Sequence, residues 1–183
     1  DQIIGQAEDM IFQRLPNLPC FRQTTTANLV AGTTDYVVTG ARMIRQVSII
    51  SSNVVSYLDH RVDSYLRDYW PNATTQDTPK FYSTKSASGT SGTLGGSGTT
   101  ITIAPTPNAA DTYQVDYIAP EMGISSLNPN TWISNNAENV LLSACLYEAS
   151  AFLKAGETLA LYKTQFDEAL QLFIQEMQRD YAA

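Results

Sequence analysis

The clearest pattern in the chain lies in its last third, NNAENVLLSACLYEASAFLKAGETLALYKTQFDEALQLFIQEM (residues 135–177). Apolar residues recur there at every third or fourth position, which is the spacing of one face of a helix. The stretch is interrupted near Gly156, so it predicts two helices joined by a short connection and packed antiparallel. The side chains that we expect to be buried in this pair are Leu141, Cys145, Phe152, Phe166 and Phe173.

Both ends of the first of these helices carry boundary signals. Asn135, three residues before Glu138, resembles a capping box and predicts the start of the helix. Gly156 is expected to end it, because glycine tolerates the backbone conformation in which helices commonly terminate. The second helix then continues to Met177 and beyond.

Upstream of the helix pair the pattern changes from helical to alternating. Residues 2–14 show helical apolar spacing and are followed by Pro16, so they predict an amphipathic helix. Apolar residues then alternate with polar ones, which is typical of strands. We expect a hairpin formed by residues 24–30 and 36–38, and a third strand at residues 44–50.

Two further segments complete the middle of the chain. Residues 59–70 return to helical spacing and stop at Pro71, which predicts a short helix that carries His60. Residues 79–118 predict a three-stranded meander. Its first hairpin has a long flexible tip at residues 84–100, which is mostly Gly, Ser and Thr and cannot build a core.

Together these elements predict an α+β fold, with an N-terminal helix, a β-rich middle of antiparallel hairpins and a C-terminal antiparallel helix pair. The length of 183 residues suits a single domain. Within it we expect a helical part formed by residues 1–15 and 135–181, and a β-rich part formed by residues 20–118.

The composition limits what the protein can bind. Its net charge of -7 at pH 7 has the wrong sign for sequence-specific binding of DNA or RNA through phosphates. Only 16% of the residues are charged, and ten are Tyr, which combines apolar area with a polar tip. This composition favours a surface that becomes covered in an assembly. No apolar run has the length of about 20 residues that a membrane span needs.

Candidate catalytic and metal-binding residues are scarce. His60 is the only histidine, and Asp63 would share its face of the predicted helix. Cys20 and Cys145 are predicted to be unpaired thiols, and with one histidine they cannot assemble a zinc site. The residues therefore predict a protein that is not an enzyme and needs no metal or cofactor.

The basic residues Arg42, Arg45, Arg61 and Arg67 form one grouping before a strongly acidic remainder. This grouping has two interpretations. It makes ion pairs with neighbouring carboxylates, which we favour, or it forms a patch that contacts phosphates.

Four segments in a set order carry a resemblance to a known family. They are TPKFY (residues 78–82), ITIAPTP (residues 101–107), YQVDY (residues 113–117) and TWISNN (residues 131–136), the last leading into the predicted helix pair. In this order and spacing the chain resembles the head-to-tail adaptor proteins of tailed bacteriophages, which are also called connector or head-completion proteins.

The resemblance implies a structural virion protein at the head-tail interface, assembled in the host cytoplasm. Twelve copies would form a ring that docks beneath the portal protein, extends the DNA ejection channel and provides the attachment platform for tail or nozzle proteins. Double-stranded DNA would pass through without sequence-specific binding, and no membrane would be involved. The residues that we expect to bind partners are Leu94, Trp132, Glu176, Met177, Arg179 and Tyr181.

A function of a different class stays open at this point. A tail-fibre or carbohydrate-binding β module would use Trp70, Trp132 and surface tyrosines as flat platforms for sugars. A hydrolase would have to depend on His60.

Overall fold

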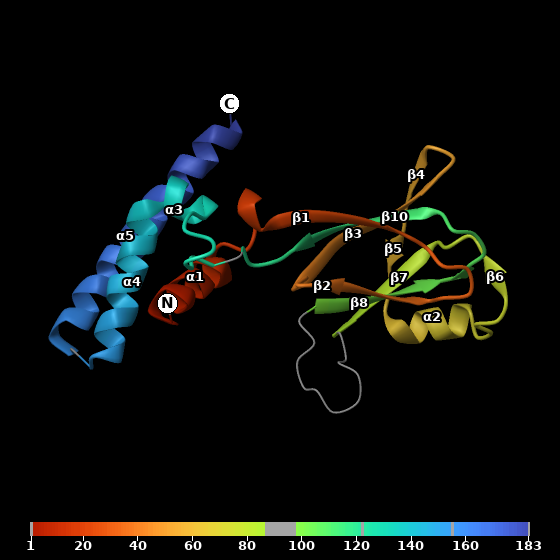
Figure 1. Cartoon of the computed structure of the whole chain (residues 1–183), viewed down its shortest axis with the longest axis horizontal. Coiled ribbons are helices and arrows are strands. Elements are labelled where there is room, and N and C mark those ends of the chain that lie inside the picture. Colours follow the sequence, from red (N-terminus) through yellow and green to blue (C-terminus); the bar gives the residue numbers. More distant parts are fainter. Residues whose placement is uncertain (1, 87–97, 122, 155, 183) are drawn as a thin grey trace. The chain divides into compact units, whose positions relative to one another are not determined.

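The computed structural model describes residues 2–86, 98–121, 123–154 and 156–182, without the side chains of residues 157 and 179–182. The chain divides into two compact units (Figure 1). The helical unit comprises residues 1–21 and 120–183, and the β unit comprises residues 22–119. The α+β class predicted from the sequence is confirmed, whereas the organisation as a single domain stays a prediction.

The β unit contains two four-stranded sheets and a two-stranded ribbon. All pairs in the first sheet are antiparallel, and in the second only β5 and β7 run parallel. The first sheet has the order β1 (Arg22–Asn28), β10 (Thr112–Ile118), β3 (Met43–Ser51) and β4 (Val54–Tyr57). The second has the order β2 (Asp35–Thr39), β8 (Gly98–Ala104), β7 (Phe81–Ser86) and β5 (Asp59–His60). The ribbon pairs β6 (Gln76–Asp77) with β9 (Thr106–Pro107).

The predicted strands exist, but two of the predicted pairings are wrong. The expected hairpin of residues 24–30 and 36–38 does not form, because β1 pairs with β10 and β2 pairs with β8. The expected meander of residues 79–118 is also split: β7 and β8 pair as predicted, whereas β10 belongs to the other sheet. Alternating apolar residues indicate a strand, but they do not indicate its partner.

The core of the β unit is formed by side chains from both sheets. In β2, for example, Tyr36 and Val38 are buried while Val37 is 59% exposed, as the alternation of a strand requires. The Tyr36 hydroxyl donates to the backbone carbonyls of Val30 and Thr33, so its polar tip is satisfied. The cluster comprises Leu29, Tyr36, Val38, Ala41, Val47, Ile49, Leu58, Tyr82, Ile101, Ile103, Tyr113 and Val115.

The short helix α2 (Asp63–Tyr69) begins later than predicted. His60 lies in β5, where it pairs with Tyr82 of β7, so its placement on the helix is wrong, as is the shared helix face with Asp63. The apolar spacing belongs only to the later part of the segment, whose Leu66 is buried.

The helical unit consists of α1 (Gln2–Arg14), the one-turn helix η1 (Pro19–Phe21), α3 (Trp132–Asn136), α4 (Glu138–Phe152) and α5 (Gly156–Ala182). Figure 1 shows α4 and α5 side by side and antiparallel, as predicted, and α1 packs against α4. The core residues come from all of these elements. They are Ala7, Ile11, Phe12, Leu18, Phe21, Ile133, Ala137, Val140, Leu141, Ala144, Phe166, Leu170 and Phe173.

The helix boundaries differ from the two signals identified in the sequence. Thr131, and not Asn135, forms a capping box: its side chain accepts from the backbone N–H of Ser134, and Ser134 Oγ accepts from the backbone N–H of Thr131. Gly156 does not end α4, because it is the first residue of α5. Among the described residues of this connection, Lys154 has a positive φ of 54°.

The predicted burial of the helix pair is confirmed for three side chains and wrong for one. Leu141, Phe166 and Phe173 are buried, and Cys145 is half-buried. Phe152, however, is 74% exposed. It occupies the last position of α4, where the described residues leave it uncovered. The periodic pattern marks an apolar face, but does not show that the same chain covers it.

Candidate functional site

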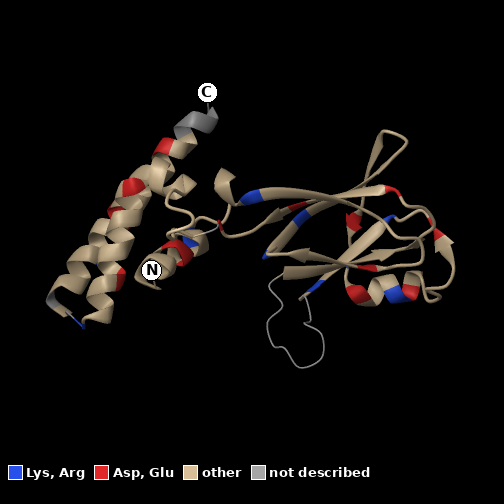
Figure 2. Ribbon diagram, viewed as in Figure 1, with Lys and Arg blue, Asp and Glu red and all other residues tan. Residues whose placement is uncertain are grey.

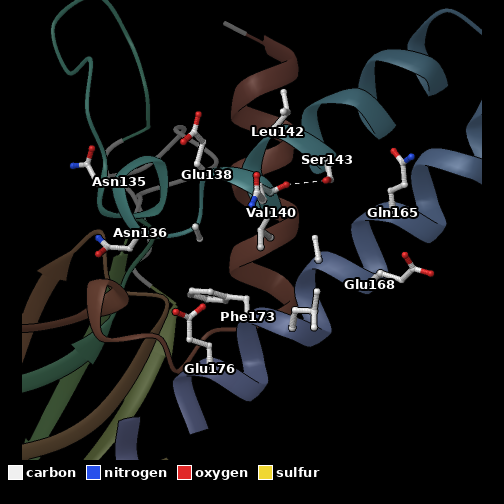
Figure 3. A pocket seen from close by; sticks show the side chains of 14 residues that line it. Asn135, Asn136, Glu138, Val140, Leu142, Ser143, Gln165, Glu168, Phe173 and Glu176 are labelled. Carbon is white, nitrogen blue, oxygen red and sulfur yellow. Dashed lines mark hydrogen bonds between the residues drawn. The ribbon is translucent and has the colours of Figure 1, made fainter. Parts of the chain in front are cut away.

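A groove of about 600 Å³ opens between α3 and the start of α4 on one side and α5 on the other (Figure 3). Its deeper part is apolar, since Val140 and Phe173 are buried and Ala169 is half-buried. Leu142 and Leu172 line it with exposed side chains, at 56% and 68%. The described residues of the helical unit thus leave an apolar surface uncovered.

The charged residues that line this groove all have the same sign. Glu138 comes from the first turn of α4, and Glu168 and Glu176 come from α5; no Lys or Arg lines the groove among the described residues. Figure 2 marks acidic positions along these helices in red. Four amide side chains and the hydroxyl of Ser143 complete the polar lining; the amides are Asn135, Asn136, Asn139 and Gln165. The groove therefore combines an apolar interior with an acidic rim.

The leucines of this groove have a signal in the sequence. Leu142 and Leu172 lie off the apolar stripes that hold the helices together. Leu146 and Leu161 share that property, and both are exposed. Apolar residues outside the core stripe of a helix can therefore indicate a surface meant for contact.

A second uncovered apolar surface is the hairpin of β3 and β4. Residues 51–57 are all exposed and uncharged, with Val54, Val55 and Tyr57 exposed by 63%, 49% and 66%. Ser52 and Asn53 form its turn with positive φ angles of 49° and 65°. β4 is the edge strand of its sheet, so its outer backbone groups are available for pairing.

Among the residues predicted to bind partners, Trp132 and Glu176 are brought to the same groove region. Trp132 is half-buried, with its ring centroid 6.3 Å from that of Phe173. Its backbone N–H donates to Glu121 Oε1 at 2.7 Å. Glu176 is exposed and lines the groove. Trp132 therefore has a packing role within the helical unit, whereas Glu176 is accessible.

The structure describes the other predicted partner-binding residues only in part. Met177 is half-buried on α5. Arg179 and Tyr181 belong to the same helix, but their side chains lie outside the described residues. Leu94 and most of the predicted tip 84–100 lie outside them too; β7 ends at Ser86 and β8 starts at Gly98.

A family model described as SU10 adaptor protein matches residues 1–183. The chain belongs to this family of phage head-tail adaptors. No curated protein sequence matches it. The resemblance stated from the sequence is thereby confirmed, and the adaptor is a structural component of a phage virion.

The aromatic residues around α2 form another exposed feature of the adaptor. The rings of Tyr65 and Tyr69 are stacked, with centroids 6.0 Å apart, and Phe81 meets both edge-on. Tyr65 and Tyr69 are each 40% exposed. Trp70 is half-buried, and its indole N–H donates to the backbone carbonyl of Thr75. The Arg61 guanidinium lies over the Tyr65 ring, 5.5 Å from its centroid, so the tyrosines are exposed only in part.

Arg61 and Arg67 of the predicted basic grouping make ion pairs. Arg61 approaches Asp59 at 3.6 Å, and Arg67 approaches Asp63 at 2.8 Å. The ion-pair interpretation is confirmed for these two. Arg42 and Arg45 are exposed and lie at the start of β3.

The titratable groups of the helical unit show why its thiols are poor nucleophiles. Burial raises the pKa of Cys20 to about 12, with a further rise from nearby Glu121. Burial also raises the pKa of Cys145, which lies near Glu8. Because the thiolate is the reactive form, neither thiol is activated. Both cysteines are free, as predicted.

Glu8 holds the loop that follows the β unit. Both of its carboxylate oxygens accept from the backbone N–H of Ile124 at 3.2 Å. Burial raises the pKa of this carboxyl, the hydrogen bond lowers it, and the nearby carboxylates of Glu121 and Asp9 raise it again. This acidic corner thus positions the loop at a cost in electrostatic repulsion.

No catalytic or metal-binding constellation stands out in the described part of the chain. His60 is exposed, and its ring lies 5.1 Å from that of Tyr82. The described residues contain no group of three or more His, Cys, Asp or Glu placed to hold a metal ion. They also contain no helix long and apolar enough to cross a membrane.

Proposed function

We propose that twelve copies of the adaptor form a ring that docks beneath the portal, extends the DNA channel and provides the platform for tail or nozzle proteins. The observation that carries the proposal is the match of the adaptor family over residues 1–183, because membership implies interaction with portal and tail proteins. The copies assemble in the host cytoplasm and remain in the virion at the head-tail interface.

The uncovered apolar surfaces support this proposal. An isolated soluble monomer rarely exposes large contiguous apolar patches, and such patches commonly mark protein interfaces. The adaptor exposes the acidic groove, the end of α4 with Phe152 and Leu153, and the β3–β4 hairpin. A ring subunit meets two neighbours, the portal and the tail, so several separate contact surfaces are expected.

We propose that the predicted partner-binding residues contact different partners. The tail of α5 after Glu176, with Met177, Arg179 and Tyr181, faces the portal, and Glu176 binds a partner through the groove that it lines. The hairpin tip with Leu94 contacts a neighbouring subunit or a tail protein. Trp132 supports α5 by packing on Phe173.

The adaptor has no enzymatic activity and no cofactor in this proposal, and DNA passes through the ring without sequence-specific contacts. The net charge of -7 supports free passage, since a strongly basic channel would retain DNA through its phosphates.

Negative-stain electron microscopy tests the proposal. The purified adaptor is imaged alone and with purified portal, and portal particles carrying an additional twelvefold ring at one end are expected. An adaptor that stays monomeric and leaves the portal unchanged would overturn the ring.

A carbohydrate-binding tail-fibre module is the second candidate, favoured by the partly exposed rings of Tyr65 and Tyr69. Aromatic faces of this kind can serve as platforms for sugars. Specific binding of the free adaptor to a glycan array, lost in Tyr65→Ala, would support this module; absence of binding would exclude it for the glycans tested.

A further inference from the structure

The lining of the acidic groove indicates which kind of side chain it binds best. Its apolar interior favours an apolar side chain, and its rim of Glu138, Glu168 and Glu176 favours cations on either side of that side chain. The charge balance of the whole unit points the same way. The helical unit has four Lys or Arg against eleven Asp or Glu, a net charge of -7.

The β unit is electrically different. It has seven Lys or Arg against seven Asp and no Glu, a net charge of zero. Three of its basic residues, Arg61, Arg67 and Lys85, make ion pairs within the unit. Among the described residues, Arg22 and Arg45 make none.

The strand register relates Arg22 of β1 to Met43 of β3, two residues before Arg45. Arg22 of β1 is opposite Ile118 of β10, and Ile118 is opposite Met43 of β3. Paired residues of neighbouring strands share a face of the sheet, so Arg22 and Met43 lie on the same face. A register shift follows Met43 between Asp116 and Tyr117 of β10, and leaves Arg45 without an opposite residue.

We call Arg22, Arg42, Met43 and Arg45 the basic patch. Met43 is 52% exposed, and all three arginines are exposed. The carboxylate of Asp116, which lies opposite Thr24 of β1 and Gln46 of β3, accepts from Thr24 Oγ1 at 2.7 Å. The patch therefore presents an apolar side chain flanked by cations, which is the chemistry that the groove prefers.

We propose that the acidic groove of one adaptor copy binds the basic patch of a second copy, with Met43 entering the apolar interior and Arg22 and Arg45 facing the glutamates. The contact rests on the proposed ring. It joins two different surfaces, so each copy uses its groove toward one neighbour and its patch toward the other, as a closed ring requires.

Two charge-reversal variants test the contact. The groove variant is Glu168→Lys with Glu176→Lys, and the patch variant is Arg22→Glu with Arg45→Glu. Each variant alone brings like charges together at every contact, so its self-association should weaken at least about tenfold. Sedimentation velocity and negative-stain images, with and without portal, measure the association, and circular dichroism verifies the fold.

An equimolar mixture of the two variants provides the decisive measurement. A reversed groove then meets a reversed patch, and a native groove meets a native patch, so alternating copies should assemble as the native adaptor does. A contact between the two units of one chain cannot be restored by mixing, so failure of the mixture would overturn the proposal.

The matched controls change charge outside both surfaces: Asp9→Lys in the helical unit and Lys80→Glu in the β unit. Both residues are exposed, and both variants should associate like the native adaptor. Equal loss in the controls would mean a general charge effect and would overturn the contact. If the native adaptor forms rings and both reversal variants do too, the ring stands and the contact fails. If the native adaptor forms none even with portal, both fail.

Discussion

The β unit and the helical unit differ in charge and in where they bury their apolar side chains. The β unit collects side chains from two sheets into one cluster and carries no net charge. The helical unit carries the entire net charge of -7 and leaves Phe152, Leu153 and Leu172 exposed by 74%, 73% and 68%. Both units leave apolar side chains exposed, since the β3–β4 hairpin exposes Val54, Val55 and Tyr57. The difference teaches that only the helical unit combines its exposed apolar residues with a net negative charge.

The largest loss of stability is expected for a buried residue of the helical unit, compared with an exposed residue of its groove. Phe166→Ala removes a ring that is 1% exposed and should lower the free energy of unfolding by about 3 to 5 kcal/mol. Leu172→Ala, on the same helix but exposed, should cost under about 0.5 kcal/mol. Thermal unfolding followed by circular dichroism measures both. Equal losses would mean that the groove face is part of the core.

A smaller loss of stability is expected at the N-terminal cap of α3. Thr131→Ala removes the oxygen that accepts from the N–H of Ser134 and should cost about 1 kcal/mol. Asn135→Ala should be nearly neutral, because the cap of α3 does not use that side chain. A chemical denaturation curve compares the two. A larger cost for Asn135 would restore the boundary predicted from the sequence.

The acidic corner of the helical unit predicts a pH-dependent difference. Burial and the nearby Glu121 and Asp9 raise the pKa of Glu8 in the folded state, so folding binds protons there and stability falls as the pH rises above the ordinary value of a glutamate. Glu8→Gln keeps an oxygen for the N–H of Ile124 but cannot ionise. Its melting temperature should match that of the native adaptor near pH 4 and exceed it at neutral pH. A difference that is constant with pH would exclude this role of Glu8.

The smallest effect is expected in the β unit. His60→Ala removes an exposed ring beside Tyr82 and should change stability by under about 0.5 kcal/mol. Ring formation on portal should stay within about twofold of the native level. A folded His60→Ala protein that no longer supports phage assembly would show that this histidine has a function not assigned to it here.

The elements of the fold were largely predictable, because helix and strand periods are local. Residues 2–14 match α1, and the strands at residues 44–50 and 113–117 match β3 and β10. The pairing was not predictable in the same way. β1 meets β10 across about ninety residues of chain, and only the packing of the whole unit selects such a partner over a nearby one.

The candidate surfaces were less predictable for a related reason. Phe152 and Phe166 each belong to a helical stripe of apolar residues in the sequence. In the structure, however, Phe152 is exposed and Phe166 is buried. The period of a helix reports which residues share a face, but the chain that covers that face can be another molecule. The basic patch was visible only in part, as Arg42 and Arg45, because Arg22 joins it through strand register.

The division of the helical unit into two distant segments has a consequence for the order of folding. α1 packs against α4, so the first helix of the chain must wait for residues 138–152 before it finds its partner. The whole β unit is synthesised in between, and domains generally fold as their sequence emerges. We therefore expect the β unit to be folded while α1 is still unpaired. The groove needs α5 as well, so a nascent adaptor should be unable to bind a neighbour through it until synthesis has passed residue 176.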